Sequence, residues 1–304
     1  MSETQEEATT DDGNERFDYD VVVVGGGPAG CSAALFTERY DLDTVVFDRG
    51  RSSIQRCAHL ENYLGFPAGI DVETFYGLMH DHLVETGCDL VSDMVESVTR
   101  ADDGPGFVVE TQDDGVVTAR RVIAATRYDG EYMRGLDDDE AMFYTHEHFE
   151  RSYAEMDGTT PIEGLYVASP SEEADRQAII AAGRGARVGI AVVEAAAVDE
   201  GYPEELADRY DWIRRESTLT GEWADTDRWR EWFENNLPED HGLSEERKVE
   251  LRERAIDRRF ETYITDEDIA DRTERGQRSL LDHIDDRLIV KRARKIDAAS
   301  GRTS

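Results

Sequence analysis

One stretch near the amino terminus, DYDVVVVGGGPAG (residues 18–30), restricts the fold more than any other part of the chain. Its β-branched run predicts a strand that is buried on both faces, as strands are in a parallel sheet. The residues that follow, AGCSAALFTERY (29–40), keep small or apolar side chains on one face and predict a helix packed closely on that sheet. Gly25, Gly27 and Gly30 lie between these two elements with the spacing G-x-G-x-x-G. The order strand, glycine turn, helix indicates an α/β fold.

The glycine spacing is typical of a turn that binds a dinucleotide. The first glycine permits the tight turn, the second lets a pyrophosphate approach the backbone, and the third lets the helix lie close to the strand. A second buried strand, TVVF (44–47), ends at Asp48, 18 residues after Gly30, where a carboxylate can accept hydrogen bonds from an adenosine ribose. The predicted phosphate and ribose contacts are Gly25, Gly27, Pro28, Ala29, Gly30, Asp48 and Arg49. We therefore expect a Rossmann-like dinucleotide-binding unit.

Later segments continue the α/β pattern. VETFYGLMHDHLVET (72–86) predicts an amphipathic helix, and CDLV (88–91) predicts a third strand. Residues 94–125 alternate in short segments separated by DDG-type turns, which predicts a β-meander that returns to a buried strand. LYVAS predicts a final strand, and residues 174–198 predict a long helix.

The pieces GGGPAG, FDRG, ENYLGFP, VIAAT and LYVAS with RQAIIAAGRGA, taken in order, resemble the FAD domain of the thioredoxin reductase family and its flavoprotein disulfide reductase relatives. The resemblance covers residues 18–198 and implies FAD as the cofactor. It implies that Asn62 lies against the flavin and that Ala125 and Thr126 form a turn near the dinucleotide. The helix that begins near Gln177 and Ala178 would point its amino terminus at the flavin pyrimidine, where it stabilises the negative charge of the reduced ring.

The chain departs from the family pattern at three places. Ser169-Pro170 stands where the family has Gly-Asp, and one lost charge-assisted hydrogen bond to the ribityl chain costs about 1.5 to 3 kcal/mol. Arg127 stands where the family has the glycine of Ala-Thr-Gly. Residues 127–163 are too few for a nicotinamide-binding domain of about 100 residues, and they contain neither a second glycine motif nor a cysteine.

These departures leave two classes of function open. The first is a FAD-dependent oxidoreductase that receives electrons from a small molecule or a protein donor, and the intact phosphate turn and late helix favour it. The second is a non-catalytic FAD-binding or dinucleotide-binding regulatory protein, which the missing carboxylate favours. A module that binds only NAD is disfavoured by the meander and the late strand and helix.

The charge of the chain bears on its partners. The 304 residues include 69 acids against 34 Lys and Arg, for a net charge of -35, which excludes non-specific binding to nucleic acid or anionic membranes. Many acids with only three lysines resemble the proteins of salt-accumulating halophiles. No run is apolar enough to span a bilayer, and residues 1–17 read as a disordered acidic tail without the apolar region of a secretory signal. We therefore expect a cytoplasmic protein.

Composition changes near Glu200, which divides the chain into a FAD-binding domain (18–200) and a helical region (201–304) that we expect to form a homodimer. Helices are expected at 203–216, 226–236, 244–263 and 277–296, with helix N-caps at Asp225 and Ser244. All four tryptophans lie in the second part. They favour the core of a small helical subdomain, and the alternative is a cover over the exposed flavin face.

Candidates for other chemistry are weaker. The three cysteines form no CxxC motif, so a redox dithiol is excluded. Cys57 lies in a region where some relatives carry a redox cysteine, although an inert loop cysteine is favoured. His146, His148 and Glu150 could share a strand face as metal ligands, but solvated polar residues are favoured. No metal site is predicted, and no catalytic residue is assigned.

Overall fold

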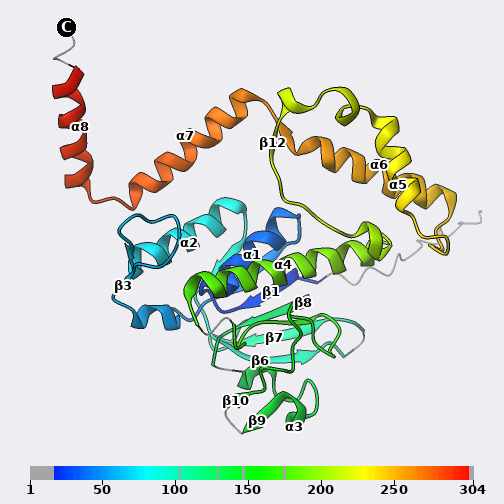
Figure 1. The fold of residues 1–304 in the computed structure, drawn as a ribbon. Coiled ribbons are helices and arrows are strands. Elements are labelled where there is room, and N and C mark those ends of the chain that lie inside the picture. Colours follow the sequence, from blue (N-terminus) through cyan, green and yellow to red (C-terminus); the bar gives the residue numbers. More distant parts are fainter. Residues whose placement is uncertain (1–16, 103, 129, 146–147, 174–175, 301–304) are drawn as a thin grey trace, which may run out of the picture.

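The computed structural model describes residues 17–300 except 103, 129, 146–147 and 174–175, so almost all of the expected acidic tail lies outside the described residues. A seven-stranded sheet with the strand order β5-β2-β1-β8-β7-β6 forms the centre of the molecule, and β11 also pairs with β8 (Figure 1). The strands are β1 (Tyr19–Val24), β2 (Thr44–Phe47), β5 (Asp89–Val91), β6 (Val95–Arg100), β7 (Phe107–Thr111), β8 (Val116–Ala125) and β11 (Leu165–Ser169). The predicted α/β class with a mostly parallel sheet is confirmed.

Strand β8 joins the meander to the parallel part of the sheet. Its first half pairs antiparallel with β7, and the same edge of its second half pairs parallel with β11. Its other edge pairs parallel with β1, from Ala119 to Ala124. The sequence predicted only short segments over residues 94–125, whereas the structure forms one strand of ten residues from Val116 to Ala125. The carboxyl ends of β1, β8 and β11 therefore meet at one edge of the sheet.

Three helices cover one face of the sheet: α1 (Pro28–Arg39), α2 (Val72–Thr86) and α4 (Ala178–Asp199) (Figure 1). Helices α1 and α4 cross closely because α4 presents glycines at the contact. A Cβ atom on Gly185 would lie 1.9 Å from the carbonyl oxygen of Ala29, and one on Gly189 would lie 2.6 Å from that of Ala33. The two helices run in the same direction, with Gly185, two turns into α4, level with the start of α1.

The segment between β8 and β11 covers the opposite face. It contains η2 (Glu131–Met133), α3 (Asp139–Met142), β9 (Phe143–Thr145) and β10 (His148–Phe149). Alternate residues of β1 point to opposite faces of the sheet. Val21 and Val23 share a core with α1 and α4, whereas Val22 and Val24 share a second core with buried side chains of this segment. The segment that showed no periodicity in the sequence thus completes the domain.

The long connection after β2 contains η1 (Ser53–Arg56), β3 (His59–Leu60) and β4 (Ile70–Asp71). The C-terminal region contains η3 (Glu204–Leu206), β12 (Arg214–Arg215), η4 (Glu216–Thr218), η5 (Gly221–Trp223), α5 (Thr226–Asn236), α6 (Glu245–Glu261), β13 (Tyr263–Ile264), α7 (Asp266–Asp282) and α8 (Asp286–Ser300). The predicted N-caps are confirmed, because the side chains of Asp225 and Ser244 accept hydrogen bonds from the first turns of α5 and α6.

Two helix predictions in this region are wrong. Residues 203–216 form η3, an irregular stretch and β12, where the Arg209 guanidinium donates to the carbonyl oxygens of Leu206, Ala207 and Asp208 that a helix would have used. The helix expected at 277–296 is divided into α7 and α8. The division occurs where the Asp285 carboxylate accepts a hydrogen bond from the backbone N–H of Arg287 and so caps a new helix.

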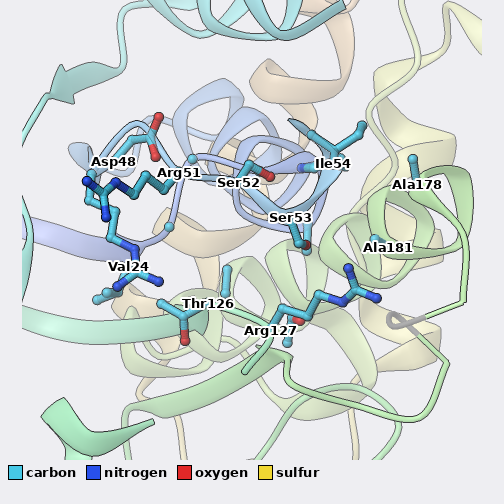
Figure 2. A pocket seen from close by; sticks show the side chains of 18 of the residues that line it. Val24, Asp48, Arg51, Ser52, Ser53, Ile54, Thr126, Arg127, Ala178 and Ala181 are labelled. Atoms are coloured by element: carbon cyan, nitrogen blue, oxygen red, sulfur yellow. The ribbon is translucent and has the colours of Figure 1, made fainter. Parts of the chain in front are cut away.

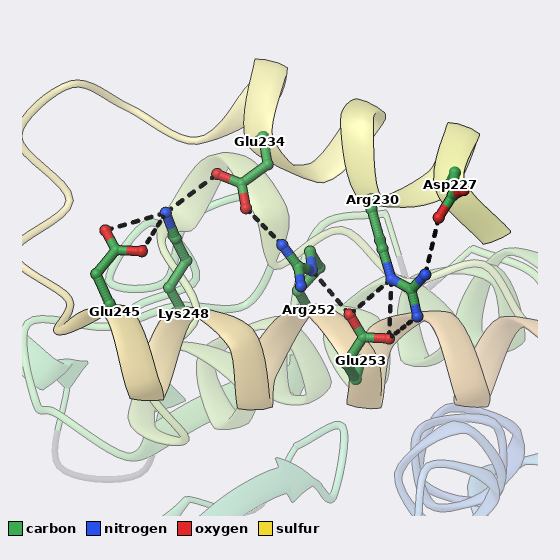
Figure 3. Close-up of polar contacts among 7 residues, drawn as sticks. All are labelled: Asp227, Arg230, Glu234, Glu245, Lys248, Arg252 and Glu253. Atoms are coloured by element: carbon green, nitrogen blue, oxygen red, sulfur yellow. Dashed lines mark hydrogen bonds and ion pairs between the residues drawn. The ribbon is translucent and has the colours of Figure 1, made fainter.

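Helices α5 and α6 are joined by a chain of ion pairs (Figure 3). Arg230 of α5 donates to both oxygens of the Glu253 carboxylate on α6, and Arg252 of α6 contacts both Glu253 and Glu234. Lys248 extends the chain to Glu234 and Glu245. A connected network holds its side chains more firmly than isolated surface pairs do.

Replacing Glu253 with glutamine is expected to remove a pH-dependent part of the stability. The hydrogen bond from Arg230, with a further one from Arg252, lowers the pKa of Glu253 from its ordinary value of 4.5 to about 2. A depressed pKa contributes stability that is present above pH 4.5 and is lost as the pH falls toward 2. Because the side chain is 35 % exposed, solvent screening keeps this contribution below about 1 kcal/mol.

The measurement is the melting temperature of both proteins between pH 7 and pH 3. The difference should be largest at pH 7 and should shrink as the pH falls below 4.5. Glu274→Gln removes an equally charged group from an exposed i,i+4 pair with Arg278 and should leave the profile unchanged. A Glu253→Gln difference that stays constant with pH would contradict the role of the carboxylate charge.

Candidate functional site

A cavity of about 600 Å³ opens at the carboxyl ends of the parallel strands, within the size range of small-molecule sites. It is lined by the glycine turn after β1, the end of β2 with the loop that follows, the end of β8 and the start of α4. Figure 2 shows Asp48 and Arg51 on one side of this space and Ala178 and Ala181 of α4 on the other. These four separate segments of the chain therefore converge on one site.

Every predicted cofactor contact except Gly30 lines this cavity. The lining set includes Gly25, Gly27, Pro28, Ala29, Asp48, Arg49, Asn62, Ala125, Thr126, Gln177 and Ala178. Gly30 lies beneath the turn, where a Cβ atom would approach the carbonyl oxygen of Gly25 to 1.8 Å. Gly25 itself has a φ of 113°, which favours glycine. The residues predicted from separate motifs are brought together, and their roles in binding stay predictions.

Two helix amino termini face this one cavity. The N-cap residues of α1 and α4 are Gly27, which has no side chain, and Gln177, whose side chain does not cap its helix. The Gln177 Oε1 atom instead accepts a hydrogen bond of 2.7 Å from Asn62 Nδ2. Uncapped N–H groups and the helix dipole make each terminus attractive to an anion. The cavity therefore suits a ligand that carries negative charge at two separate positions.

The Asp48 carboxylate is held by groups that sequence reasoning missed. Its Oδ1 accepts a hydrogen bond from the backbone N–H of Gly50, and its Oδ2 accepts one of 2.5 Å from the Tyr76 hydroxyl. The His80 Nε2 atom lies 3.6 Å from the same oxygen and 3.1 Å from the Gly26 carbonyl oxygen. A carboxylate offers about four lone-pair positions, so capacity for a ribose remains. The i,i+4 spacing of Tyr76 and His80 could have indicated their common face.

Arginines are concentrated at this cavity although the chain is strongly acidic. The lining cations are Arg49, Arg51, Arg127 and Arg176, and the lining acids are Asp48, Glu61 and Asp93. Arg127 has a φ of 68°, a left-handed conformation that the glycine of the family pattern adopts without strain. Its side chain extends along the cavity toward α4 (Figure 2). This local excess of positive charge again favours an anionic ligand.

The carboxyl end of β11 shows what the change to Ser169-Pro170 does. Ser169 lines the cavity but is only 3 % exposed, and its carbonyl oxygen accepts a hydrogen bond from the backbone N–H of Arg127. Just behind it, the buried Arg184 guanidinium donates to the carbonyl oxygens of Val167 and Ala168. The strand end is thus held by backbone contacts, and this residue pair presents no carboxylate to a ligand.

The cysteines and the candidate metal ligands predicted from the sequence lie in different environments. Cys57 is exposed and lines the cavity, whereas Cys31 and Cys88 are buried. His146 lies outside the described residues, so the structure does not test its part in the metal site considered for His146, His148 and Glu150. Among the described residues, no group of three His, Cys, Asp or Glu side chains is arranged to hold a metal ion.

The hypothesis that a tryptophan covers the flavin is wrong. No tryptophan is among the residues that line this cavity. Trp212, Trp229 and Trp232 line a different cavity in the C-terminal region. Only Trp229 is buried, at 5 % exposure, so the favoured interpretation of a tryptophan core holds for that residue alone.

Comparison with known proteins agrees with the geometry. Residues 19–147 match the sequence family described as pyridine nucleotide-disulphide oxidoreductase. Thioredoxin reductase from Listeria monocytogenes is 36% identical over 112 residues, which cover 36% of this chain and 33% of that protein. The bifunctional thioredoxin reductase/thioredoxin from Mycobacterium leprae is 34% identical over 119 residues, which cover 38% of this chain and 25% of that protein. The chain thus spans about a third or less of the curated relatives that it matches.

Among solved structures, a thioredoxin reductase from Gloeobacter violaceus aligns with 60% of this chain and 97% of its own, at 19% identity and a TM-score of 0.47. None of the helices in the described part of the chain has the length and apolar character needed to cross a membrane. The family match covers the glycine turn, Asp48 and all of β8. Residues 19–147 are therefore similar in sequence to the pyridine nucleotide-disulphide oxidoreductase family and, within the matched part, to thioredoxin reductases.

Proposed function

We propose that the protein is a FAD-dependent oxidoreductase that holds FAD in the cavity between the amino termini of α1 and α4. The observation that carries this proposal is that two uncapped helix termini face one cavity. The terminus of α1 receives the pyrophosphate, and the terminus of α4 lies at the flavin pyrimidine. Bound FAD supplies the electron-transfer chemistry, and the chain supplies binding and charge stabilisation.

The proposed contacts follow from this placement. Gly25 and Gly27 let the pyrophosphate approach the backbone, and Asp48 accepts hydrogen bonds from the adenosine ribose while Tyr76 holds it in place. Pro170 stands where the family has the aspartate, so this position gives the ribityl chain no carboxylate partner. We therefore expect FAD to bind about ten- to a hundredfold more weakly than it would with that partner.

Electrons must reach this site from outside the described fold. The short segment after β8 packs against the sheet and forms no second dinucleotide-binding unit in its described residues. A small-molecule reductant or a protein donor is the proposed source. Because the match covers only a third or less of these relatives, the identity of that donor does not transfer from them.

The first experiment is the visible spectrum of the protein purified in molar salt, with the nucleotide released on denaturation identified by mass. About one FAD per chain is the expected result. Anaerobic addition of NADPH or a dithiol, followed by an acceptor, then tests for turnover. FAD that binds but is never reduced and reoxidised would favour the regulatory alternative, which the missing carboxylate at Ser169-Pro170 supports. A colourless protein that takes up no FAD would overturn both.

We also propose that the chain works in a salt-rich cytoplasm. With a net charge of -35, the acidic side chains repel one another unless salt screens them. The Debye length falls to about 3 Å at molar ionic strength. At about 0.1 M salt the Debye length is about 10 Å. The thermal unfolding midpoint should therefore rise as the potassium chloride concentration is increased from about 0.1 M to molar concentration. An unchanged midpoint would contradict the proposed adaptation to salt.

The proposed homodimer forms through α7 and α8, which extend from the C-terminal region as an arm (Figure 1). No residue of either helix is buried, and Leu280, Leu281 and Leu288 are about half exposed or more. Helix α8 also carries five Arg and Lys side chains against two acids, which suits the acidic surface of a second copy. An amphipathic arm of this kind requires an apolar partner surface.

Introducing charge on this arm should therefore separate the subunits. The double replacement Leu280→Asp and Leu281→Asp is expected to reduce the mass measured by light scattering from that of a dimer to that of a monomer. Leu64→Asp is the matched control, because Leu64 is 86 % exposed on the other part of the molecule. A dimer that survives the double replacement would place the subunit contact elsewhere.

A further inference from the structure

A second cavity, of about 760 Å³, lies where the carboxyl end of α1 meets the C-terminal region. Its walls come from the end of α1 with Tyr40 and Asp41, the irregular stretch before β12, α5, α6 and Arg272 of α7. It shares no residue with the cavity at the amino terminus of α1. The tryptophans that the first site does not use are found here.

Cationic side chains outnumber acidic ones in this cavity, although the whole chain has about two acids for each base. The lining cations are Arg39, Arg209, Arg214, Arg258, Arg259 and Arg272, and the lining acids are Asp41, Asp208, Asp211 and Glu261. Asp211 pairs with Arg39 through both of its oxygens. The hydrogen bonds of Arg209 go to carbonyl oxygens, and those of Arg214 go to Trp212 and Thr262.

Arg258 lies 4.0 Å from the Asp41 carboxylate, whereas no ion pair with a carboxylate is found among the described residues for Arg209, Arg214 or Arg259. Burial, followed by the charge of Arg258, lowers the pKa of Arg209, and burial with the charge of Arg214 lowers that of Arg259. Like charges that are partly removed from water destabilise one another. An anion in the cavity would offset this repulsion, and an arginine guanidinium is well matched to phosphate.

Aromatic rings form the rest of the wall. The lining aromatic residues are Tyr40, Tyr202, Tyr210, Trp212, Trp229, Trp232 and Phe233. Tyr210 and Trp212 are 63% and 62% exposed, which leaves large ring faces open to a ligand. The Arg259 guanidinium lies 3.9 Å from the centre of the Trp229 ring, so a cationic group and an aromatic face are already adjacent.

We propose that this second cavity binds a nucleoside phosphate, with the base stacked on the exposed aromatic rings and the phosphate held by the arginines. Helix α1 separates the two cavities by about 17 Å, from its residue count and rise. Hydride transfer requires reacting atoms about 3 to 3.5 Å apart, so a ligand here does not exchange a hydride directly with the first site. It acts as an effector, and the proposal does not depend on FAD in the first cavity.

Intrinsic fluorescence provides a specific readout. Three of the four tryptophans line this cavity, and the fourth, Trp223, lies 5.7 Å from Trp229 between ring centres. The full chain, saturated with FAD so that any FAD site is filled, is titrated with ADP at the lowest salt concentration that keeps it folded. A saturable change in fluorescence is expected, with adenosine and pyrophosphate each binding at least tenfold more weakly. Adenosine that binds as tightly as ADP would overturn the phosphate assignment.

Substitutions locate the site. Arg259→Gln and Arg272→Gln should each weaken ADP binding about tenfold or more, because each removes a charge-assisted contact. Arg272 lies on the exposed face of α7, so its replacement tests the site even if Arg259→Gln fails to fold. Arg278→Gln, on the same helix but outside the cavity, should leave ADP affinity unchanged. No saturable change, equal effects in all three variants, or release of FAD by ADP would overturn the proposal.

Discussion

Replacing Gly185 with alanine is expected to destabilise the N-terminal domain by about 3 kcal/mol or more, at the upper end for overpacking. The added Cβ atom would lie 1.9 Å from the Ala29 carbonyl oxygen and 2.9 Å from its Cα atom. Both are backbone atoms of α1, so no side-chain rotation can relieve the contact. The two helices must move apart, which opens the core that Val188 and Val192 share with Ala33.

Gly183 provides the matched control because it lies in the same helix and has no atom within 4 Å of the position of a Cβ. Gly183→Ala should stabilise the protein by about 0.5 to 1 kcal/mol, since alanine loses less backbone entropy in a helix. The measurement is denaturant unfolding of the unchanged protein and of the Gly185→Ala and Gly183→Ala variants, with the midpoint and the slope of each transition. Equal midpoints for the two variants would show that α1 and α4 do not cross as closely as these distances require.

The same crossing explains why the N-terminal domain was predictable from the sequence. The small residues Ala29, Ala33, Gly185 and Gly189 allow α1 and α4 to lie in close contact. Two helices in such contact cover the same strands of the sheet. Strong local signals, the β-branched run of β1 and the glycine turn, then determine where α1 starts. The late strand and helix, far along the chain from β1, therefore return to the cavity that the first turn begins.

The loop after β2 and the C-terminal region were less predictable because tertiary contacts decide their structure. Ser52, Ser53 and Ile54 line the first cavity, yet they belong to a loop whose sequence carries no binding motif. In the C-terminal region, the Arg209 guanidinium donates hydrogen bonds to backbone carbonyl groups that would otherwise accept helical hydrogen bonds. The periodicity of apolar residues in the sequence does not predict such a contact. The arginine and aromatic cavity likewise arises only when α1, α5 and α6 come together.

Replacing Gly27 with aspartate is expected to lower FAD affinity about a hundredfold or more while leaving the fold stable, since like charges placed together cost several kcal/mol. Gly27 is the N-cap of α1, with φ of -85° and ψ of -175°, an extended conformation that any residue can adopt. Aspartate is among the best N-cap residues, so its carboxylate would satisfy the free N–H groups of the helix. That carboxylate would then occupy the position proposed for the pyrophosphate and repel it.

Gly27→Asn separates charge from size, because asparagine caps a helix equally well and has nearly the same shape. Either side chain places its Cβ atom 2.8 Å from Ser52 Oγ, a contact that rotation of the serine side chain relieves. We expect the asparagine variant to retain much more FAD affinity than the aspartate variant, with similar unfolding midpoints for both. The measurement is FAD fluorescence quenching on titration. Equal loss of affinity in the two variants would show that the side chain blocks the site by its size, and the role of the α1 terminus as an anion site would then be wrong.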